Sequence, residues 1–132
     1  MKYIILTYGT QQDYDAMTGQ NPDRPALTPE DFAPMGAFME EFTKELMESG
    51  ELVDNRGLAA PVHTRRVQLQ DGVPVVTDGP YAETQEVLAG YTIVECATID
   101  RALEIAAGLV NPDAPGEYVD VRPVLDGVED LD

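Results

Sequence analysis

Residues 2–9 read Lys2-Tyr3-Ile4-Ile5-Leu6-Thr7-Tyr8-Gly9. The run is rich in β-branched and aromatic residues and ends at a glycine, which predicts a buried β-strand. Successive side chains of a strand point to opposite faces of its sheet. In this strand the residues of both faces are apolar. We therefore expect a sheet whose two faces are both covered.

The segment that follows predicts a loop and then a long helix. Residues 10–25 are polar and contain several glycine and proline breakers, so we expect a long surface loop. Thr28 is suited to cap a helix and Pro29 to its first position. An apolar face at helical spacing continues to Ser49-Gly50, where a helix stop is expected. Pro34 lies inside this pattern and predicts a short first turn offset from the main helix.

The rest of the chain alternates strands with one further helix. The dipeptide Asp71-Gly72 is a strong turn signal between two short strands and predicts a β-hairpin. Thr98 is suited to cap a second helix, which should end before Asn111-Pro112. The expected strands are residues 51–58, 64–69, 73–77, 90–97 and 118–124.

This order of elements predicts an α+β fold. Two β-α-β units with a hairpin between them are typical of a ferredoxin-like sheet with two helices on one face. The simplest cover for the other face is a second copy of the chain, so we expect a homodimer. Residues 1–125 are expected to form one domain, and residues 126–132 an acidic C-terminal tail.

Composition excludes several classes of partner. The chain has 8 basic and 25 acidic residues and a formal net charge of −17, a field that repels nucleic acid and anionic membranes. The acidity serves solubility or forms a face for a basic partner protein. The first apolar run is too short for a signal or a membrane span, and the single cysteine, Cys96, forms no internal disulfide. We expect a cytoplasmic protein.

One segment resembles a known family motif. It reads Val76-Thr77-Asp78-Gly79-Pro80-Tyr81-Ala82-Glu83-Thr84-Gln85-Glu86 and is followed by Leu88-Ala89-Gly90-Tyr91. This block is similar to the motif of the DGPF branch of the YCII-related family, with Tyr81 where phenylalanine is usual and Gln85 where lysine is usual. The resemblance extends over residues 2–6, 49–50, 100–102 and 121–124.

The resemblance implies a ferredoxin-like chain that pairs into a dimeric α+β barrel. It also implies a link to extracytoplasmic-function sigma factors, which DGPF-branch proteins often accompany. Some relatives are credited with elimination chemistry on small molecules through a His–Asp pair. The histidine of that pair would lie near the start of the first long helix, and residues 33–38 of this chain contain none.

Few residues are suited to carry chemistry. His63 is the only histidine, and it is either a general acid or base or a loop residue without a chemical role. Ser49 is the only serine and follows a helix, which argues against a Ser-His-Asp triad. Cys96 lies in an apolar strand and is expected to be structural. One histidine and one cysteine provide no spacing for zinc, and no phosphate loop is present. Carboxylates are suited to magnesium or calcium, but no motif for either ion is present, so we expect neither a metal nor a cofactor.

The DGPF-like block is the predicted ligand-binding site. Gly79 and Pro80 fix a turn that would hold Asp78 in a defined geometry. We expect Asp78 to be ionised, partly buried and paired either with Arg122 or with backbone N–H groups of its turn. The alternative is a structural corner with a salt bridge. The predicted ligand-binding set is Asp78, Gly79, Pro80, Tyr81, Glu83, Glu86 and Arg122.

These residues predict a dimeric domain that binds a small molecule or a partner protein. The enzyme alternative is a cofactor-free lyase, isomerase or oxygenase that acts in the barrel cleft. The weak candidates for its proton carrier are His63, Asp78 and Glu83. A third alternative is an interaction module whose acidic surface is the working part.

Overall fold

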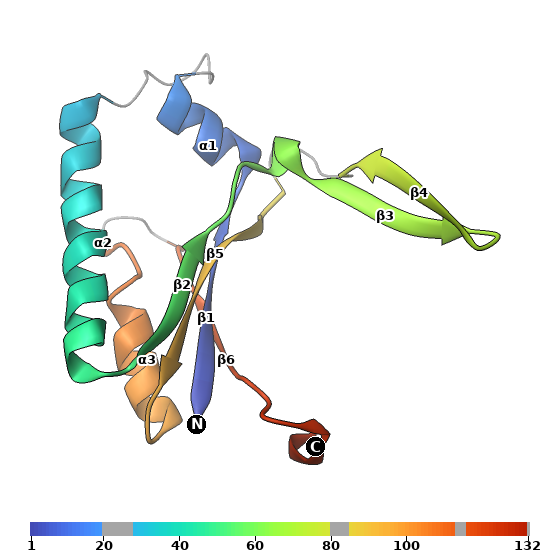
Figure 1. The fold of residues 1–132 in the computed structure, drawn as a ribbon. Coiled ribbons are helices and arrows are strands. Elements are labelled where there is room, and N and C mark those ends of the chain that lie inside the picture. The colour runs from blue at the N-terminus through green and yellow to red at the C-terminus, as the bar shows by residue number, and fades with distance from the viewer. Residues whose placement is uncertain (20–27, 80–84, 113–115, 132) are drawn as a thin grey trace.

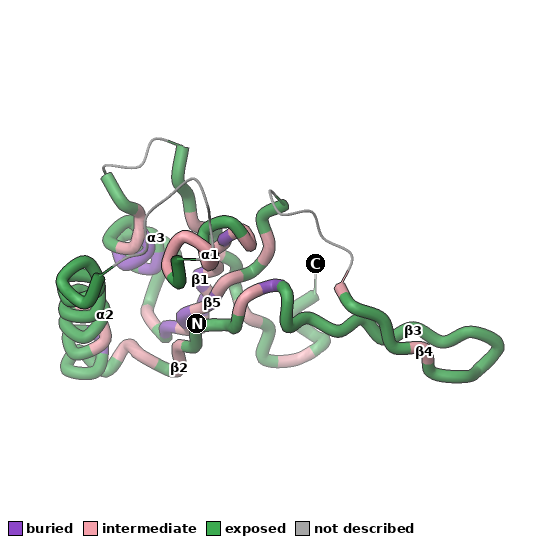
Figure 2. The backbone as a smooth tube through the Cα atoms, turned by 90° about the horizontal axis from the view of Figure 1, so that it is seen from above, coloured by how far each residue is buried: buried purple, intermediate pink, exposed green. Residues whose placement is uncertain are grey.

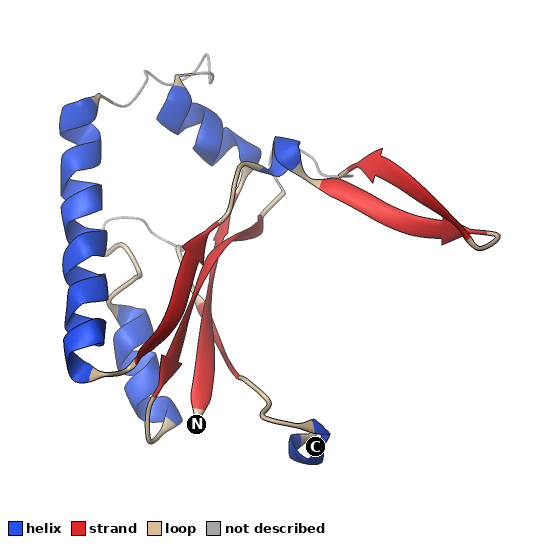
Figure 3. Cartoon of the chain, in the orientation of Figure 1, coloured by secondary structure: helices blue, strands red, loops and turns tan. Residues whose placement is uncertain are grey.

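The computed structural model describes residues 1–19, 28–79, 85–112 and 116–131. Over these residues the chain is an α+β protein (Figures 1 and 3). Its elements are β1 (Lys2–Gly9), α1 (Gln11–Thr18), α2 (Pro29–Ser49), β2 (Leu52–Gly57), β3 (Arg65–Gln70), β4 (Val73–Asp78), β5 (Val87–Glu95), α3 (Ile99–Ala107) and β6 (Asp120–Pro123). Short 3₁₀ turns follow at Pro61–His63 and, within the expected acidic tail, at Val128–Asp130.

The main sheet has the strand order β2-β5-β1-β6, and each neighbouring pair is antiparallel. This is the order that two β-α-β units produce when their strands interleave, as the sequence predicts. Helices α2 and α3 lie on one face of the sheet (Figure 1). The other strands, β3 and β4, form a separate hairpin.

The core lies between this sheet and the two helices. Tyr3 and Ile5 of β1 and Val94 of β5 are buried together with Leu46 of α2, and Ile5 and Val94 are 0% exposed. Helix α3 adds Ala102, Ile105 and Ala106 to this cluster. Cys96 packs against it as a half-buried residue, consistent with a structural role.

The opposite face of the sheet carries the alternate residues of the same strands. Ile4 of β1 pairs with Ile93 of β5, and Leu6 pairs with Tyr91. All four side chains are only half-buried. In the same rows, Arg122 and Asp120 of β6 and Asp54 and Arg56 of β2 lie at the two edges, so this open face is apolar at its centre and charged at its edges. Since α2 and α3 lie on the other side (Figure 2), the open face has no helical cover within the described part of the chain.

The polar segment after β1 was wrongly predicted to be a loop throughout. Residues 11–18 form α1, which Thr10 caps through a reciprocal pair of hydrogen bonds with Asp13, and Gly19 ends it at a φ of 79°. No residue of α1 is buried, so it has no apolar stripe that the sequence would display. Residues 20–25 of the predicted loop lie outside the described residues.

The predicted offset at Pro34 was also wrong, because α2 is continuous from Pro29 to Ser49. A proline removes only its own hydrogen bond to the carbonyl four residues earlier, which for Pro34 belongs to Glu30 near the helix start. The reciprocal hydrogen bonds between Thr28 and Asp31 hold the first turn of the helix, which precedes Pro34. The predicted start and Gly50 stop are confirmed.

The predicted hairpin is confirmed. Asp71 and Gly72 both have positive φ, 51° and 79°, as a tight two-residue turn requires. All six residues of β3 and all but Val75 of β4 are exposed. The hairpin extends away from the sheet on the side opposite α2 (Figures 1 and 2).

Candidate ligand-binding cleft

The DGPF-like block begins at Val76 within β4 and continues beyond the end of that strand at Asp78. Asp78 lies opposite Arg65 of β3, and the two form an ion pair of 3.3 Å between Oδ1 and Nη1. The Asp78 side chain is 87% exposed. The predicted partial burial of Asp78 and its pairing with Arg122 were therefore wrong: Asp78 is paired with the cross-strand arginine, in solvent. The alternative, a pairing with backbone N–H groups of its turn, involves residues 80–84, which lie outside the described residues. The backbone N–H of Gly79 donates to the carbonyl of Thr64 at 3.2 Å. Pro80, Tyr81 and Glu83 lie outside the described residues.

The other described members of the predicted set lie near β6. The hydroxyl of Tyr118 donates to Glu86 Oε2 at 2.6 Å, and this hydrogen bond raises the pKa of Tyr118. The Tyr118 ring lies 5.6 Å from that of Tyr8, whose hydroxyl donates to Asp120. Arg122 pairs with Ile4 in the sheet register and forms no ion pair with any described residue. Glu86 and Arg122 thus both adjoin the pair of Tyr8 and Tyr118, whereas Asp78 lies on the hairpin with Arg65.

His63 ends the 3₁₀ turn of residues 61–63 and is exposed. Its backbone N–H donates to the carbonyl of Ala60 at 3.0 Å. Neither His63 nor Asp78 borders the large cleft described next.

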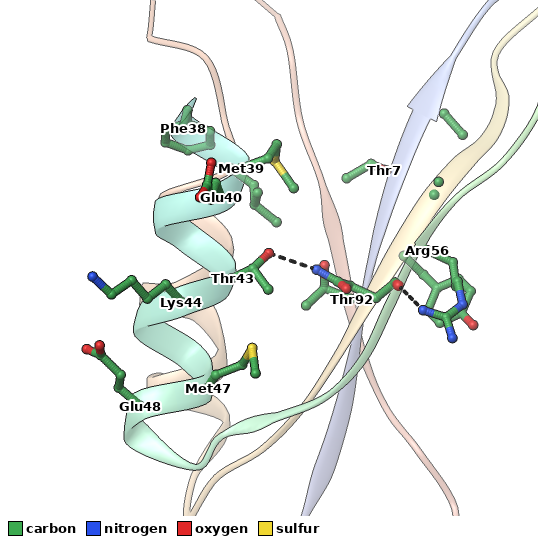
Figure 4. Close-up of a pocket in the computed structure, with 16 residues that line it drawn as sticks. Thr7, Phe38, Met39, Glu40, Thr43, Lys44, Met47, Glu48, Arg56 and Thr92 are labelled. Atoms are coloured by element: carbon green, nitrogen blue, oxygen red, sulfur yellow. Dashed lines mark hydrogen bonds between the residues drawn. The ribbon is translucent and has the colours of Figure 1, made fainter. Parts of the chain in front are cut away.

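A cleft of about 900 Å³ lies between α2 and the helix-facing side of the sheet (Figure 4). Phe38, Met39 and Met47 of α2, together with Leu109, give it apolar walls. The sheet contributes a floor of small and polar residues: Thr7, Asn55, Gly57, Ala89, Gly90 and Thr92.

The cleft exists because one row of the sheet lacks bulky side chains. Thr7 of β1 pairs with Gly90 of β5, which pairs in turn with Gly57 of β2. A Cβ atom at Gly90 would lie 2.8 Å from the Arg56 carbonyl oxygen and 3.3 Å from Thr7 Oγ1. Glycine is the residue that fits such a close backbone approach. Further along the same face of the sheet, Tyr3 pairs with Val94, and these larger side chains fill the space under the helices and form part of the core.

The lining also contains polar groups that are defined in position. Asn55 Nδ2 donates to Thr43 Oγ1 at 3.2 Å, a hydrogen bond that joins sheet and helix across the cleft (Figure 4). Thr92 is a buried polar residue, 4% exposed, whose hydroxyl group is a second polar group of the lining. Behind the floor, the Tyr91 hydroxyl donates to Asp54 Oδ2 at 3.0 Å, and Asp54 pairs with Arg56 at 3.1 Å. The bond to Asp54 raises the pKa of Tyr91, so its phenol stays protonated at neutral pH.

Comparison with known proteins identifies the family. The profile of the YCII-related domain matches residues 1–126. The chain belongs to the YCII-related family. An uncharacterised protein of Rhizobium meliloti (strain 1021) is 32% identical over 124 residues, which cover 94% of this chain and 92% of that protein.

In this YCII-related chain, the histidine-free stretch of residues 33–38 forms part of α2 and ends at Phe38 on the cleft wall. The described residues contain no group of three histidine, cysteine, aspartate or glutamate side chains that is suited to hold a metal ion. Within the same residues, no helix is both long and apolar enough to cross a membrane.

Sequence reasoning missed the cleft residues because none has an unusual chemical group. Gly90 was predicted only as the start of a strand, although β5 begins at Val87 and places Gly90 inside it. A glycine within a strand is a signal of close backbone approach, and Gly57 at the end of β2 adds a second. Their meeting in one row depends on the pairing of β2 with β5, which the sequence does not display.

Proposed function

We propose that this YCII-related protein binds a small organic molecule in the cleft between α2 and the sheet. The observation that carries the proposal is the cleft itself, with apolar walls from Phe38, Met39 and Met47 and a floor that carries few polar groups. Volumes of about 300–1,000 Å³ with this mixture of residues are typical of small-molecule sites. The cleft lies within that range at about 900 Å³.

The lining defines the class of ligand. The hydroxyl groups of Thr7, Thr43 and Thr92 and the amide of Asn55 are neutral groups that both donate and accept hydrogen bonds. The charged residues of the lining are two acids and two bases, so the lining itself carries no net charge: Glu40, Glu48, Lys44 and Arg56. The net charge of −17 disfavours the entry of an anion. The proposed ligand is therefore largely apolar, neutral or cationic, and has one or two hydrogen-bonding groups.

Binding is proposed in preference to catalysis because His63 and Asp78, the described candidates for a proton carrier, lie outside the cleft. In the setting that the resemblance implies, beside an extracytoplasmic-function sigma factor, such a domain would sense its ligand and leave it chemically unchanged.

The working unit of the proposal is a homodimer. Support comes from the open face of the sheet, where Ile4, Leu6 and Ile93 are half-buried while both long helices lie on the other side. An apolar sheet face of this kind is stabilised by a second sheet, and an identical copy supplies a self-complementary one. This pairing is the α+β barrel that the resemblance implies. Sedimentation at micromolar concentration tests it, and a monomer there would reject it.

The cleft is tested with a variant that fills it. A Cβ at Gly57 meets nothing within 4 Å, so Gly57→Leu should fill part of the cleft without a backbone clash. Gly36→Leu is the matched control, because Gly36 is equally uncrowded and does not line the cleft. Wild-type protein is screened by thermal shift against neutral and cationic metabolites. A ligand at 100 times its dissociation constant stabilises by about 2.7 kcal/mol.

The expected result is a ligand that raises the unfolding temperature of wild type and of Gly36→Leu but not of Gly57→Leu. Equal shifts in all three proteins would place the ligand elsewhere and contradict the proposal.

A further inference from the structure

The β3–β4 hairpin is an exposed arm with an apolar surface. It extends beyond the main sheet, away from α2 (Figures 1 and 2). Val67, Leu69 and Val76 are 65%, 70% and 60% exposed. An isolated two-stranded hairpin is at best marginally stable in water. Among the described residues of a single chain, the arm therefore has little apolar packing that would hold it in place.

The register of the hairpin places its apolar side chains unequally on two faces. Val67 lies opposite Val76, and Leu69 lies opposite Pro74. Since side chains alternate along a strand, these four residues share one face. The other face carries Gln68 and Gln70, opposite Val75 and Val73 respectively. We call the first set, Val67, Leu69, Pro74 and Val76, the apolar face of the arm.

Charge favours a second copy of this chain as the surface that covers the apolar face. Two acidic chains of net charge −17 repel each other. Within residues 65–78, however, Arg65 and Arg66 balance Asp71 and Asp78, so the arm is electrically neutral. It is a segment that can approach another copy without added repulsion.

The arm also extends on the same side of the sheet as the open face, with its half-buried Ile4 and Leu6 (Figure 1). Among the described residues, one chain thus offers two apolar surfaces without cover, a face and a projecting arm, that point to the same side. Reciprocal contacts of this kind close a two-fold dimer.

We propose that the arm seats its apolar face on a second copy of the chain and so clasps the dimer that the open sheet faces form. This inference rests on the proposed homodimer and adds a specific clamp to it. Each copy contributes one arm and receives one. The arm becomes ordered by the contact with its partner.

The test uses charge pairs placed on either face of the arm. Val67→Lys/Val76→Glu puts opposite charges at directly paired positions on the apolar face, which supports the hairpin in water and leaves the net charge unchanged. Gln70→Lys/Val73→Glu makes the same change on the other face. Burial of the new charges should raise the dimer dissociation constant on the order of a hundredfold in the first variant only. Analytical ultracentrifugation over a concentration series measures it.

Hydrogen exchange separates failure of the arm from failure of the dimer. In the wild-type dimer the amides of β3 and β4 should be protected, and dilution to monomer should remove that protection. A wild-type dimer with freely exchanging arm amides, or an unchanged dissociation constant for Val67→Lys/Val76→Glu, would overturn the clamp and leave the sheet-to-sheet dimer standing. A wild-type monomer at micromolar concentration would overturn both.

Discussion

Helix α2 meets the sheet in two different ways along its length. Near its C-terminal end, Leu46 is buried in one cluster with Tyr3 and Val94. Further towards its N-terminal end, Phe38 and Met39 face the cleft above the row of Thr7, Gly90 and Gly57, and Met47, next to Leu46, lines the same cleft. The helix is regular throughout. The size of the side chains in each row of the sheet therefore determines whether the interface is a core or a cleft.

The packed end is also held by ionic contacts. Arg101 of α3 donates from Nε and Nη2 to the two carboxylate oxygens of Glu51, each at 2.8 Å, and the Ser49 hydroxyl donates to the same carboxylate. At the cleft, the hydrogen bond between Asn55 and Thr43 is the corresponding link. The buried core and the cleft proposed to bind a ligand thus lie side by side under one helix, over different rows of the sheet.

The largest expected effect comes from removing a side chain at the packed end. Ile5→Ala should lower the free energy of unfolding by about 3 kcal/mol, because Ile5 is 0% exposed and leaves a cavity. Thr7→Ala, on the same strand and face but at the cleft, should cost less than about 1 kcal/mol. Urea unfolding measures both. Equal losses would show that the cleft end is packed in solution.

The next effect concerns the floor of the cleft. Gly90→Ala should destabilise by about 1–3 kcal/mol, since its Cβ would lie 2.8 Å from the backbone oxygen of Arg56. Gly57→Ala, in the same row, meets nothing within 4 Å and should leave stability within about 0.5 kcal/mol of wild type. Both variants are compared by urea midpoints, and an unperturbed Gly90→Ala would contradict the close approach of β2 and β5.

The ion pair between Glu51 and Arg101 makes the stability of the packed end depend on pH. The hydrogen bonds from Arg101 are the main cause that lowers the pKa of Glu51 from 4.5 to about 2, with a further contribution from Ser49. The Glu51 carboxylate binds a proton more readily in the unfolded chain than in the folded one. The ion pair therefore contributes its full stabilisation above pH 4.5, and this stabilisation is lost as the pH falls towards 2.

Glu51→Gln should therefore lower stability by about 1–2 kcal/mol at pH 7, a value reduced for the partial exposure of the pair. It should also flatten the pH dependence of stability between pH 4.5 and 2. Urea midpoints over this range measure both effects. A variant that follows the wild-type curve would show that the Glu51–Arg101 contact does not form in solution.

The sequence was sufficient where local rules agree with the tertiary structure. Thr28, Gly50, Asp71-Gly72 and Thr98 each carry local signals, and the structure uses each one as predicted. Helix α1 escaped prediction because a polar helix held by Tyr14, which donates to the Leu58 carbonyl, has no periodic apolar signal.

The site was less predictable for a different reason. The prediction concentrated on charged residues of a recognisable motif, yet the described ones lie on the arm or near β6. The cleft arises from glycines, threonines and one asparagine that come together only through strand pairing. Such residues carry no chemical signature before the register is known.

The smallest expected effect comes from an ion pair of the arm, which is compared with one ion pair of the body. Asp78→Asn removes an ion pair with Arg65 that lies in solvent, and exposed pairs contribute about 0–1 kcal/mol. We expect a loss below about 0.5 kcal/mol, and a double-mutant cycle with Arg65→Gln should give a coupling of similar size. The matched cycle of Glu51→Gln with Arg101→Gln should give a larger coupling, because the Glu51 side chain is only 16% exposed.

Urea midpoints at low and high protein concentration measure both cycles. If the arm seats on a second copy, the Asp78–Arg65 coupling should rise with concentration while the Glu51–Arg101 coupling stays constant. A large Asp78–Arg65 coupling in the monomer would instead indicate that the base of the arm is packed within a single chain.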